Sequence, residues 1–337
     1  MMKAQTPFRA ALVAALFIAP LAHGQEVNKP AVTSLTVEND KFGGGTDRNY
    51  SNGLRFERVS GADEIFPALE WVSHRIPFLE LDRKELRQGF ALSHTIFTPE
   101  DKTLAVPDPT DRPYAAWLYA SGTIVAASAN TQDTLQVNLG VVGPSAGGEF
   151  VQNNFHRVIG AAESQGWPNQ LRDEPGLEII AQRLHRFPGP SLPMGVETDF
   201  GFDVGGGLGN VRTYAATGLT ARIGWDLDSS FGPPRIRPAL SGAGEFIPGN
   251  DANPMGGYLF IGASGRAIGR DMFLDGNLWR DGPRVDDRKT LVGDLQGGIA
   301  VHYRAVQLAF TYVNRTEEFD AQMTPQRFGA FSISIAH

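Results

Sequence analysis

Apolar and polar residues alternate with a period of two along much of the chain. From Thr134 to Val142 every second residue is Leu or Val, and from Val196 to Val204 Val, Thr and Phe alternate with Glu, Asp and Gly. This is the period of a β-strand with one apolar and one polar face. In a soluble sandwich the apolar face forms the core, whereas in an outer-membrane barrel it faces lipid and the polar face lines the lumen. Periodicity alone fits both architectures.

Three features favour the barrel. Many strand-like segments reach ten residues, which is longer than is usual in soluble sheets and suits a tilted membrane span. The last seven residues, FSISIAH, alternate up to the terminus, as in the closing strand of an outer-membrane barrel. Aromatic residues lie near segment ends, as an interfacial girdle requires. Those expected in the girdle are Trp117, Tyr119, Trp225, Tyr258, Phe260, Tyr303 and Tyr312.

Thirteen segments have the strand pattern, and a closed bacterial barrel has an even number of strands. The segment 236–246 is the weakest because it contains Pro238 and follows Gly232-Pro233-Pro234, so we assign it to a loop. The prediction is an all-β, twelve-stranded antiparallel transmembrane barrel. Its strands are expected at about 31–40, 50–59, 88–97, 115–126, 134–142, 177–186, 195–205, 211–225, 257–269, 290–303, 305–315 and 327–337.

The N-terminus has the pattern of a secretory signal peptide. Lys3 and Arg9 precede a short apolar run, and Ala22-His23-Gly24 is a small-x-small cleavage site. We therefore predict a signal peptide over residues 1–24 and a single barrel domain over 25–337. No later apolar run approaches the roughly 18 residues of a spanning helix.

Charge and cysteine content narrow the function further. The formal net charge is −7 at pH 7, and removal of the leader takes away two more positive charges, so no basic surface for nucleic acid is expected. The chain contains no cysteine, which excludes disulfides, a thiol nucleophile and Cys-ligated metals.

One segment departs from the strand period. From Gly147 to Ala162 the pattern is helical, and Glu149, Gln152, His156 and Glu163 fall near one stripe of a helix. Such a stripe either faces solvent, which is usual, or faces the barrel wall and closes a cleft. Without an HxxxH or HExxH spacing the histidine alone does not define a metal site.

Two polar clusters accompany the predicted strands. In VENDKFGGGTDRNYSNGLRFE, residues 37–57, Asp40 and Ser51 face the lumen if Leu54 and Phe56 face lipid, although the same residues also suit an ordinary hairpin loop. The second cluster brings Lys102, Asp111 and Arg112 to a strand end, where loop charges are common.

These segments together resemble the outer-membrane lipid A 3'-O-deacylase family. The matching motifs run in order over most of the chain, and the Q-x-x-x-H segment after GVVGP is specific. The matching motifs are ENDKF at 38–42, TDRNYSNG at 46–53, TPED at 98–101, DRPYA at 111–115, GVVGPSAGGEFVQNNFHRVIG at 140–160, GWPNQ at 166–170, FLDGN at 273–277 and VDDRKTLVGDLQGG at 285–298.

The resemblance implies a fold, a location and a reaction. The fold is a twelve-stranded barrel in the outer membrane, with the active site between the wall and a helix from an extracellular loop. The reaction is hydrolysis of the ester that holds the acyl chain at the 3' position of lipid A, with lipopolysaccharide as the substrate and a divalent cation, usually Ca²⁺, as the cofactor. We expect a monomer that contacts the membrane and no nucleic acid.

The motifs also carry residue roles. Asn39 and Asp40 match an Asn-Asp pair, Ser51 matches a hydroxyl position, and Gln152 and His156 match the catalytic helix, while Lys102 is a looser match. His156 is expected to activate water, because an imidazole accepts a proton near neutral pH. Asp40 is the expected Ca²⁺ ligand. The family glutamate falls on Ala162, so Glu163, one residue on, is the substitute metal ligand.

Two alternatives remain open at this stage. Ser51, His156 and Asp40 are also the residue types of a serine-nucleophile lipid esterase or phospholipase. A barrel without catalysis, either porin-like or structural, is expected to have an open polar lumen.

Overall fold

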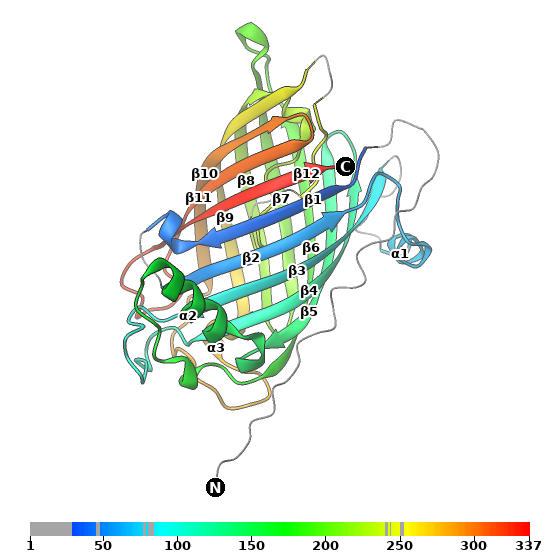
Figure 1. The fold of residues 1–337 in the computed structure, drawn as a ribbon. Helices are drawn as coiled ribbons and strands as arrows, with labels where there is room; N and C mark the ends of the chain where they lie inside the picture. The colour runs from blue at the N-terminus through cyan, green and yellow to red at the C-terminus, as the bar shows by residue number, and fades with distance from the viewer. Residues whose placement is uncertain are drawn as a thin grey trace.

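The computed structural model describes residues 29–44, 48–76, 79, 84–239, 242, 244–249 and 253–337. Within this part of the chain, twelve antiparallel strands close a barrel in sequence order, with β1 paired to β12 (Figure 1). The strands are β1 (Val32–Asn39), β2 (Asn49–Val59), β3 (Glu85–Thr98), β4 (Ala115–Ala127), β5 (Thr131–Val142), β6 (Glu174–Pro188), β7 (Glu197–Gly209), β8 (Arg212–Trp225), β9 (Met255–Asp271), β10 (Leu291–Tyr303), β11 (Val306–Arg315) and β12 (Gln326–Ala336).

The predicted twelve-stranded barrel is confirmed, and 236–246 is not one of its strands. The predicted signal peptide, residues 1–24, lies outside the described residues. No helix in the described part of the chain combines the length and apolar character needed to cross a membrane. The helices are α1 (Pro67–Ser73), α2 (Gly148–Ile159) and α3 (Met272–Asp275), with short 3-10 turns η1 (Asp40–Phe42), η2 (Pro144–Ala146), η3 (Trp167–Asn169), η4 (Pro193–Gly195) and η5 (Leu227–Ser229).

The strands are apolar outside and polar inside. On β2, Leu54 and Phe56 are 45% and 49% exposed, whereas Arg55 and Glu57 between them are 4% and 5% exposed. Since successive side chains of a strand point to opposite faces, the exposed set forms the outer surface. In a soluble sandwich the apolar side chains point inward to the core and the polar ones outward to water. The opposite arrangement found here is typical of a transmembrane barrel.

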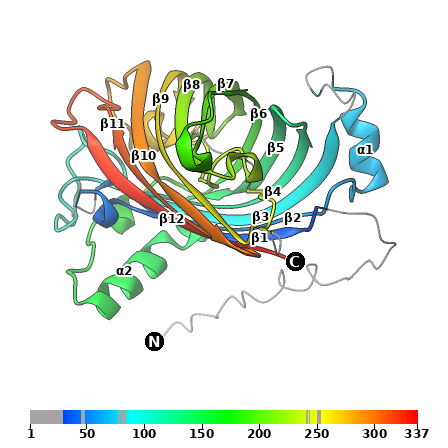
Figure 2. The same ribbon diagram turned by 90° about the horizontal axis from the view of Figure 1, so that it is seen from above.

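The lumen is filled by buried ion pairs. Asp294 accepts hydrogen bonds from Arg266 at 2.9 Å and from Arg315 at 2.8 Å. The segment between β8 and β9 folds into the ring of strands (Figure 2), where Arg235 pairs with Glu38 of β1 at 3.0 Å. Within the described residues the barrel is therefore a packed structure, in contrast to the open lumen expected of a porin.

Aromatic side chains close the lumen near the mouth that carries α2 and α3. Phe273 of α3 stacks on Phe97 with ring centroids 4.0 Å apart, and Trp117 stacks on Tyr119 at 3.8 Å. Trp117 and Tyr119 are therefore not girdle residues, because they occupy inward positions of β4.

Burial divides the expected girdle into two sets. Tyr258 and Phe260 are buried like Trp117 and Tyr119, so these predictions are wrong. Trp225, Tyr303 and Tyr312 are exposed, as a girdle requires.

The ion pairs of the lumen generate a stability prediction. Asp294→Asn removes the carboxylate that Arg266 and Arg315 share and leaves Arg315 with the longer pair to Glu318, so the free energy of unfolding should fall by about 3 to 5 kcal/mol. The measurement is urea unfolding in lipid vesicles, followed by tryptophan fluorescence. The control is Asp320→Asn, which removes an exposed pair with Lys289 and should change the value by less than about 0.5 kcal/mol. Equal effects of the two variants would contradict this assignment.

Candidate active site

The helix α2 lies outside the barrel against β3 and β4 (Figures 1 and 2). Its first residue is glycine for a steric reason: a Cβ at Gly148 would meet the Cβ of Ala116 and the ring of Trp167 at 2.5 Å. Trp167 is fully buried in an apolar cluster with Ile96, Tyr114 and Ala116. This cluster fastens the loop between β5 and β6 to the outer wall.

The helix ends three residues earlier than predicted. Gly160 adopts φ 70°, and Ala161 N–H donates to the His156 carbonyl at 2.8 Å, which is the Schellman C-cap. A left-handed residue at this point turns the chain out of the helical path. Ala162 and Glu163 therefore leave the stripe on which the sequence pattern placed Glu163.

His156 lies on the face of α2 that is turned toward the protein. Its side chain is 2% exposed, and its Nδ1 lies 2.7 Å from the Ala162 carbonyl oxygen. A carbonyl oxygen can only accept a hydrogen bond, so Nδ1 carries the proton. In the neutral imidazole, Nε2 is then the basic nitrogen. The backbone that follows the helix thus selects the tautomer.

Gln152 and Asn153, both buried, connect α2 by hydrogen bonds to the segment that follows it. Trp167 Nε1–H donates to Gln152 Oε1 at 2.9 Å, which assigns the amide orientation and leaves the –NH₂ group as the donor end. Asn153 accepts from Ser164 N–H at 2.9 Å and donates to the Ser164 carbonyl at 3.3 Å. These bonds tie the segment after α2 back to the helix and so position the carbonyl that His156 uses.

Ser51 occupies a β-bulge. The register of β2 against β3 shifts between Tyr50 and Asn52, so Ser51 has no partner residue in the ladder. Its Oγ lies 2.5 Å from Oγ1 of Thr98, which by alternation shares the outer face of β3 with Ile96. The prediction that Ser51 faces the lumen is therefore wrong, because a bulge inserts one residue and reverses the inside-outside parity. The reversal brings the hydroxyl to the side of the wall that carries α2.

Asn39 and Asp40 lie beside this bulge at the end of β1. Asn39 is paired in register with Asn52, and its side chain accepts from Lys41 N–H at 2.9 Å, which caps the turn η1. Asp40 is fully buried, and its Oδ2 accepts from Arg48 N–H at 2.6 Å. The strand pairing thus brings Asn39, Asp40 and Ser51 to one edge of the barrel mouth.

Lys102 lies in the loop between β3 and β4, next to the segment that follows α2. Its carbonyl accepts from Gln165 N–H at 2.9 Å, and its side chain is half-buried. Hydrogen bonds from Thr103 to Asp101 hold the turn and lower the pKa of that carboxyl. The structure therefore brings the Lys102 backbone close to the carbonyl-bearing segment that orients His156.

Asp111 and Arg112, at the other end of this loop, have structural partners. Burial raises the pKa of the Asp111 carboxyl, which accepts from Glu100 N–H at 2.6 Å. Arg112 is 1% exposed and pairs with Glu318 at 2.6 Å. These two residues hold the loop in place, whereas the sequence pattern predicts ordinary loop charges.

Glu163, which the sequence predicts as a metal ligand, lies on the surface. Its carboxylate accepts from Arg157 Nε–H at 2.9 Å, and both side chains are exposed. Among the described residues no three carboxylate, imidazole or thiol groups gather at one point. The oxygen donors of Asn39, Asp40 and Ser51 still suit a hard cation, which would take its remaining ligands from backbone, water or substrate.

The structure places the predicted residues on neighbouring elements. Ser51 of β2 contacts Thr98 of β3, and α2 contacts β3 and β4. Gln152 and His156 come from α2, Ser51 from the bulge of β2, Asn39 from the end of β1, Asp40 from the turn η1, and Lys102 from the loop between β3 and β4. Sequence analysis missed the supporting residues Thr98, Asn153 and Trp167. All three lie in matched motifs, Thr98 in TPED, Trp167 in GWPNQ and Asn153 in the segment 140–160, but the motifs do not indicate their contacts.

Known proteins share the fold of this chain. The family model described as "Outer membrane protein LpxR" matches residues 10–337. Among solved structures, LpxR from Salmonella typhimurium is 21% identical over 91% of this chain and 100% of that chain, with a TM-score of 0.73. The β-domain of the Bordetella autotransporter BrkA is 10% identical over 93% and 100% of the two chains, with a TM-score of only 0.44. No curated protein matches the sequence.

The match of the family model spans nearly the whole chain, and the Salmonella structure has the same fold. The chain is therefore an outer-membrane β-barrel that belongs to the LpxR family, the lipid A 3'-O-deacylase family that its motifs resemble.

Proposed function

We propose that this protein hydrolyses the ester at the 3' position of lipid A in the outer leaflet, with a divalent cation, most simply Ca²⁺, as cofactor. Family membership supports the substrate class. The proposed reaction rests on the buried His156. Its Nδ1–H donates to the Ala162 carbonyl, which makes Nε2 the basic nitrogen. A buried, tautomerically fixed imidazole between a helix and a lipid-facing wall suits general-base chemistry on a lipid ester.

In the proposed reaction His156 Nε2 takes a proton from water as the water oxygen attacks the ester carbonyl. The tetrahedral intermediate then breaks its bond to the 3' oxygen, which receives the proton from the imidazolium. The products are a fatty acid and lipid A with a free 3' hydroxyl. The Nδ1–H donor bond to Ala162 stabilises the imidazolium during the transfer and keeps the ring in one orientation.

Gln152 and Lys102 are the proposed polar partners of the substrate. The –NH₂ group of Gln152 can donate to the water or to the developing oxyanion. Lys102 supplies a positive charge for the phosphorylated head group. Arg112 is not assigned this role, because it is buried and paired with Glu318.

Asn39, Asp40 and Ser51 are the proposed oxygen ligands of the cation. When bound, Ca²⁺ supplies Lewis-acid stabilisation of negative charge on the ester oxygen. Glu163 can join this set only by leaving Arg157, so we place it outside the metal site.

Two other functions fit the structure less well. A serine nucleophile needs a base as its hydrogen-bond partner, whereas among the described residues Ser51 Oγ pairs with the hydroxyl of Thr98. A porin needs an open lumen, whereas Arg235 and the aromatic residues fill it.

The first prediction tests the base. His156→Ala should lower the rate of 3'-deacylation by about 100-fold or more, because general-base catalysis contributes at least that much. The measurement is mass spectrometry of lipid A from a Gram-negative host at matched outer-membrane levels. His74→Ala is the control, since His74 is an exposed residue at the end of α1 and should retain full activity. An unmodified lipid A with folded wild-type protein would contradict the proposed substrate.

A second prediction separates water from serine as the nucleophile. Ser51→Ala should weaken activity without abolishing it, because the hydroxyl serves as a ligand or donor. Ser51→Thr should be close to wild type, since it keeps the hydroxyl. The rates and the intact protein mass are measured together, and an acyl-enzyme adduct that requires Ser51 would favour the covalent mechanism.

The third prediction concerns the cation. Chelation should abolish activity in the purified protein, added Ca²⁺ should restore it, and Asp40→Asn should raise the Ca²⁺ concentration needed for half-maximal rate. Glu163→Gln serves as the control and should leave this concentration unchanged, because Glu163 pairs with Arg157 at the surface. Full activity of the wild type in chelator would exclude a metal role.

A further inference from the structure

The outward face of α2 is apolar and uncovered. Phe150 is 74% exposed and Val158 83% exposed, and Val151 and Phe155 are also exposed. At 3.6 residues per turn these four residues span about 140° of the helix circumference. Gln152 and His156 lie on the opposite side, buried toward the protein.

This arrangement inverts the usual amphipathic surface helix. A helix on a soluble protein buries its apolar stripe and exposes its polar face to water. Here the polar face meets the protein, and large apolar side chains point away from it. An uncovered apolar patch of this kind marks an interaction surface.

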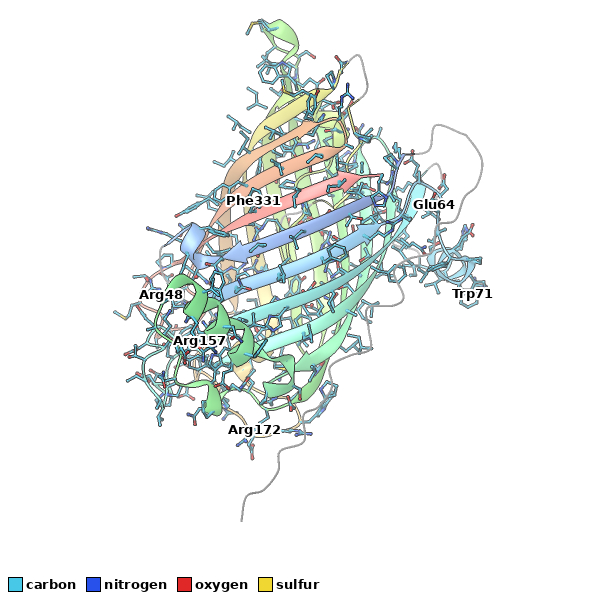
Figure 3. The ribbon with its side chains drawn as sticks, in the orientation of Figure 1. Arg48, Glu64, Trp71, Arg157, Arg172 and Phe331 are labelled. Atoms are coloured by element: carbon cyan, nitrogen blue, oxygen red, sulfur yellow. The ribbon has the colours of Figure 1, made fainter. Side chains whose placement is uncertain are left out.

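The outer surface of the barrel identifies the occupant. The helix contacts β3 and β4, and their outward side chains belong to the lipid-facing surface, as Leu92 at 48% exposed illustrates. Arg157 lies near the loop-rich mouth, at the same end as Arg48, whereas Trp71 of α1 lies at the opposite end (Figure 3). Longer loops and the mouth opposite the termini are extracellular in such barrels. The apolar face of α2 is therefore continuous with the lipid-facing surface on the outer-leaflet side.

We propose that α2 is embedded in the acyl-chain region of the outer leaflet through Phe150, Val151, Phe155 and Val158. The helix then acts as a membrane-anchored cover, which holds Gln152 and His156 against the wall from the lipid side. Lipid reaches the space between helix and wall sideways, without leaving the bilayer. Arg157 flanks the apolar face and can extend its charge toward the head groups.

The absence of cysteine makes a direct test possible without background labelling. Phe150→Cys and Val158→Cys are each labelled with a nitroxide in the full-length protein, in vesicles of phosphatidylcholine and phosphatidylglycerol. Electron paramagnetic resonance then compares the collision rates with oxygen, which partitions into lipid, and with a water-soluble nickel chelate. Leu92→Cys on the outer face of β3 is the lipid reference, and Asp320→Cys in the loop between β11 and β12 is the aqueous reference.

Both helix labels should match Leu92→Cys, with an oxygen-to-nickel ratio severalfold above that of Asp320→Cys. A ratio equal to that of Asp320→Cys at either position would overturn the proposal. The measurement needs no substrate, so it stands apart from the proposed deacylase activity. Gel mobility before and after heating checks that each labelled barrel is folded.

Discussion

Packing of Trp167 against the outer wall is the contact on which the site depends. The indole is fully buried with Ile96, Tyr114 and Ala116, and it stands under Gly148, the first residue of α2. Its ring N–H also donates to Gln152. One side chain therefore fixes both the distance of α2 from the wall and the orientation of the Gln152 amide. This anchor holds the polar face of α2 toward the protein and leaves the apolar face outward.

The filled lumen serves the site indirectly. Buried ion pairs such as Glu38 with Arg235 connect the segment inside the barrel to the end of β1, where Asn39 and Asp40 directly follow Glu38. The barrel is thereby a packed wall, and the proposed site lies on its outer, lipid-facing side. This division explains how a small number of residues from distant loops can hold a defined geometry at a membrane surface.

The strands and the site residues were predictable from the sequence to different degrees. The period of two gave all twelve strands, and Pro238 correctly removed the thirteenth segment. The orientation of Ser51 was not predictable, since one bulge residue reverses parity without a mark in the hydrophobic pattern. The pattern places Trp117 and Tyr119 in the girdle, whereas they lie in the lumen, because aromatic residues suit both the lipid face and a packed lumen. Gly160 ends α2 early, and this local turn separates Glu163 from the polar stripe.

In the proposed complex the reactive ester lies between α2 and the outer wall. The most direct measurement is an experimental structure with a lipid A analogue whose 3' ester is replaced by a non-hydrolysable amide. We expect the carbonyl of the analogue within hydrogen-bond reach of a water on His156 Nε2, with the acyl chain outside the barrel against the apolar surface. An analogue bound in the lumen, or at a part of the wall away from α2, would contradict it.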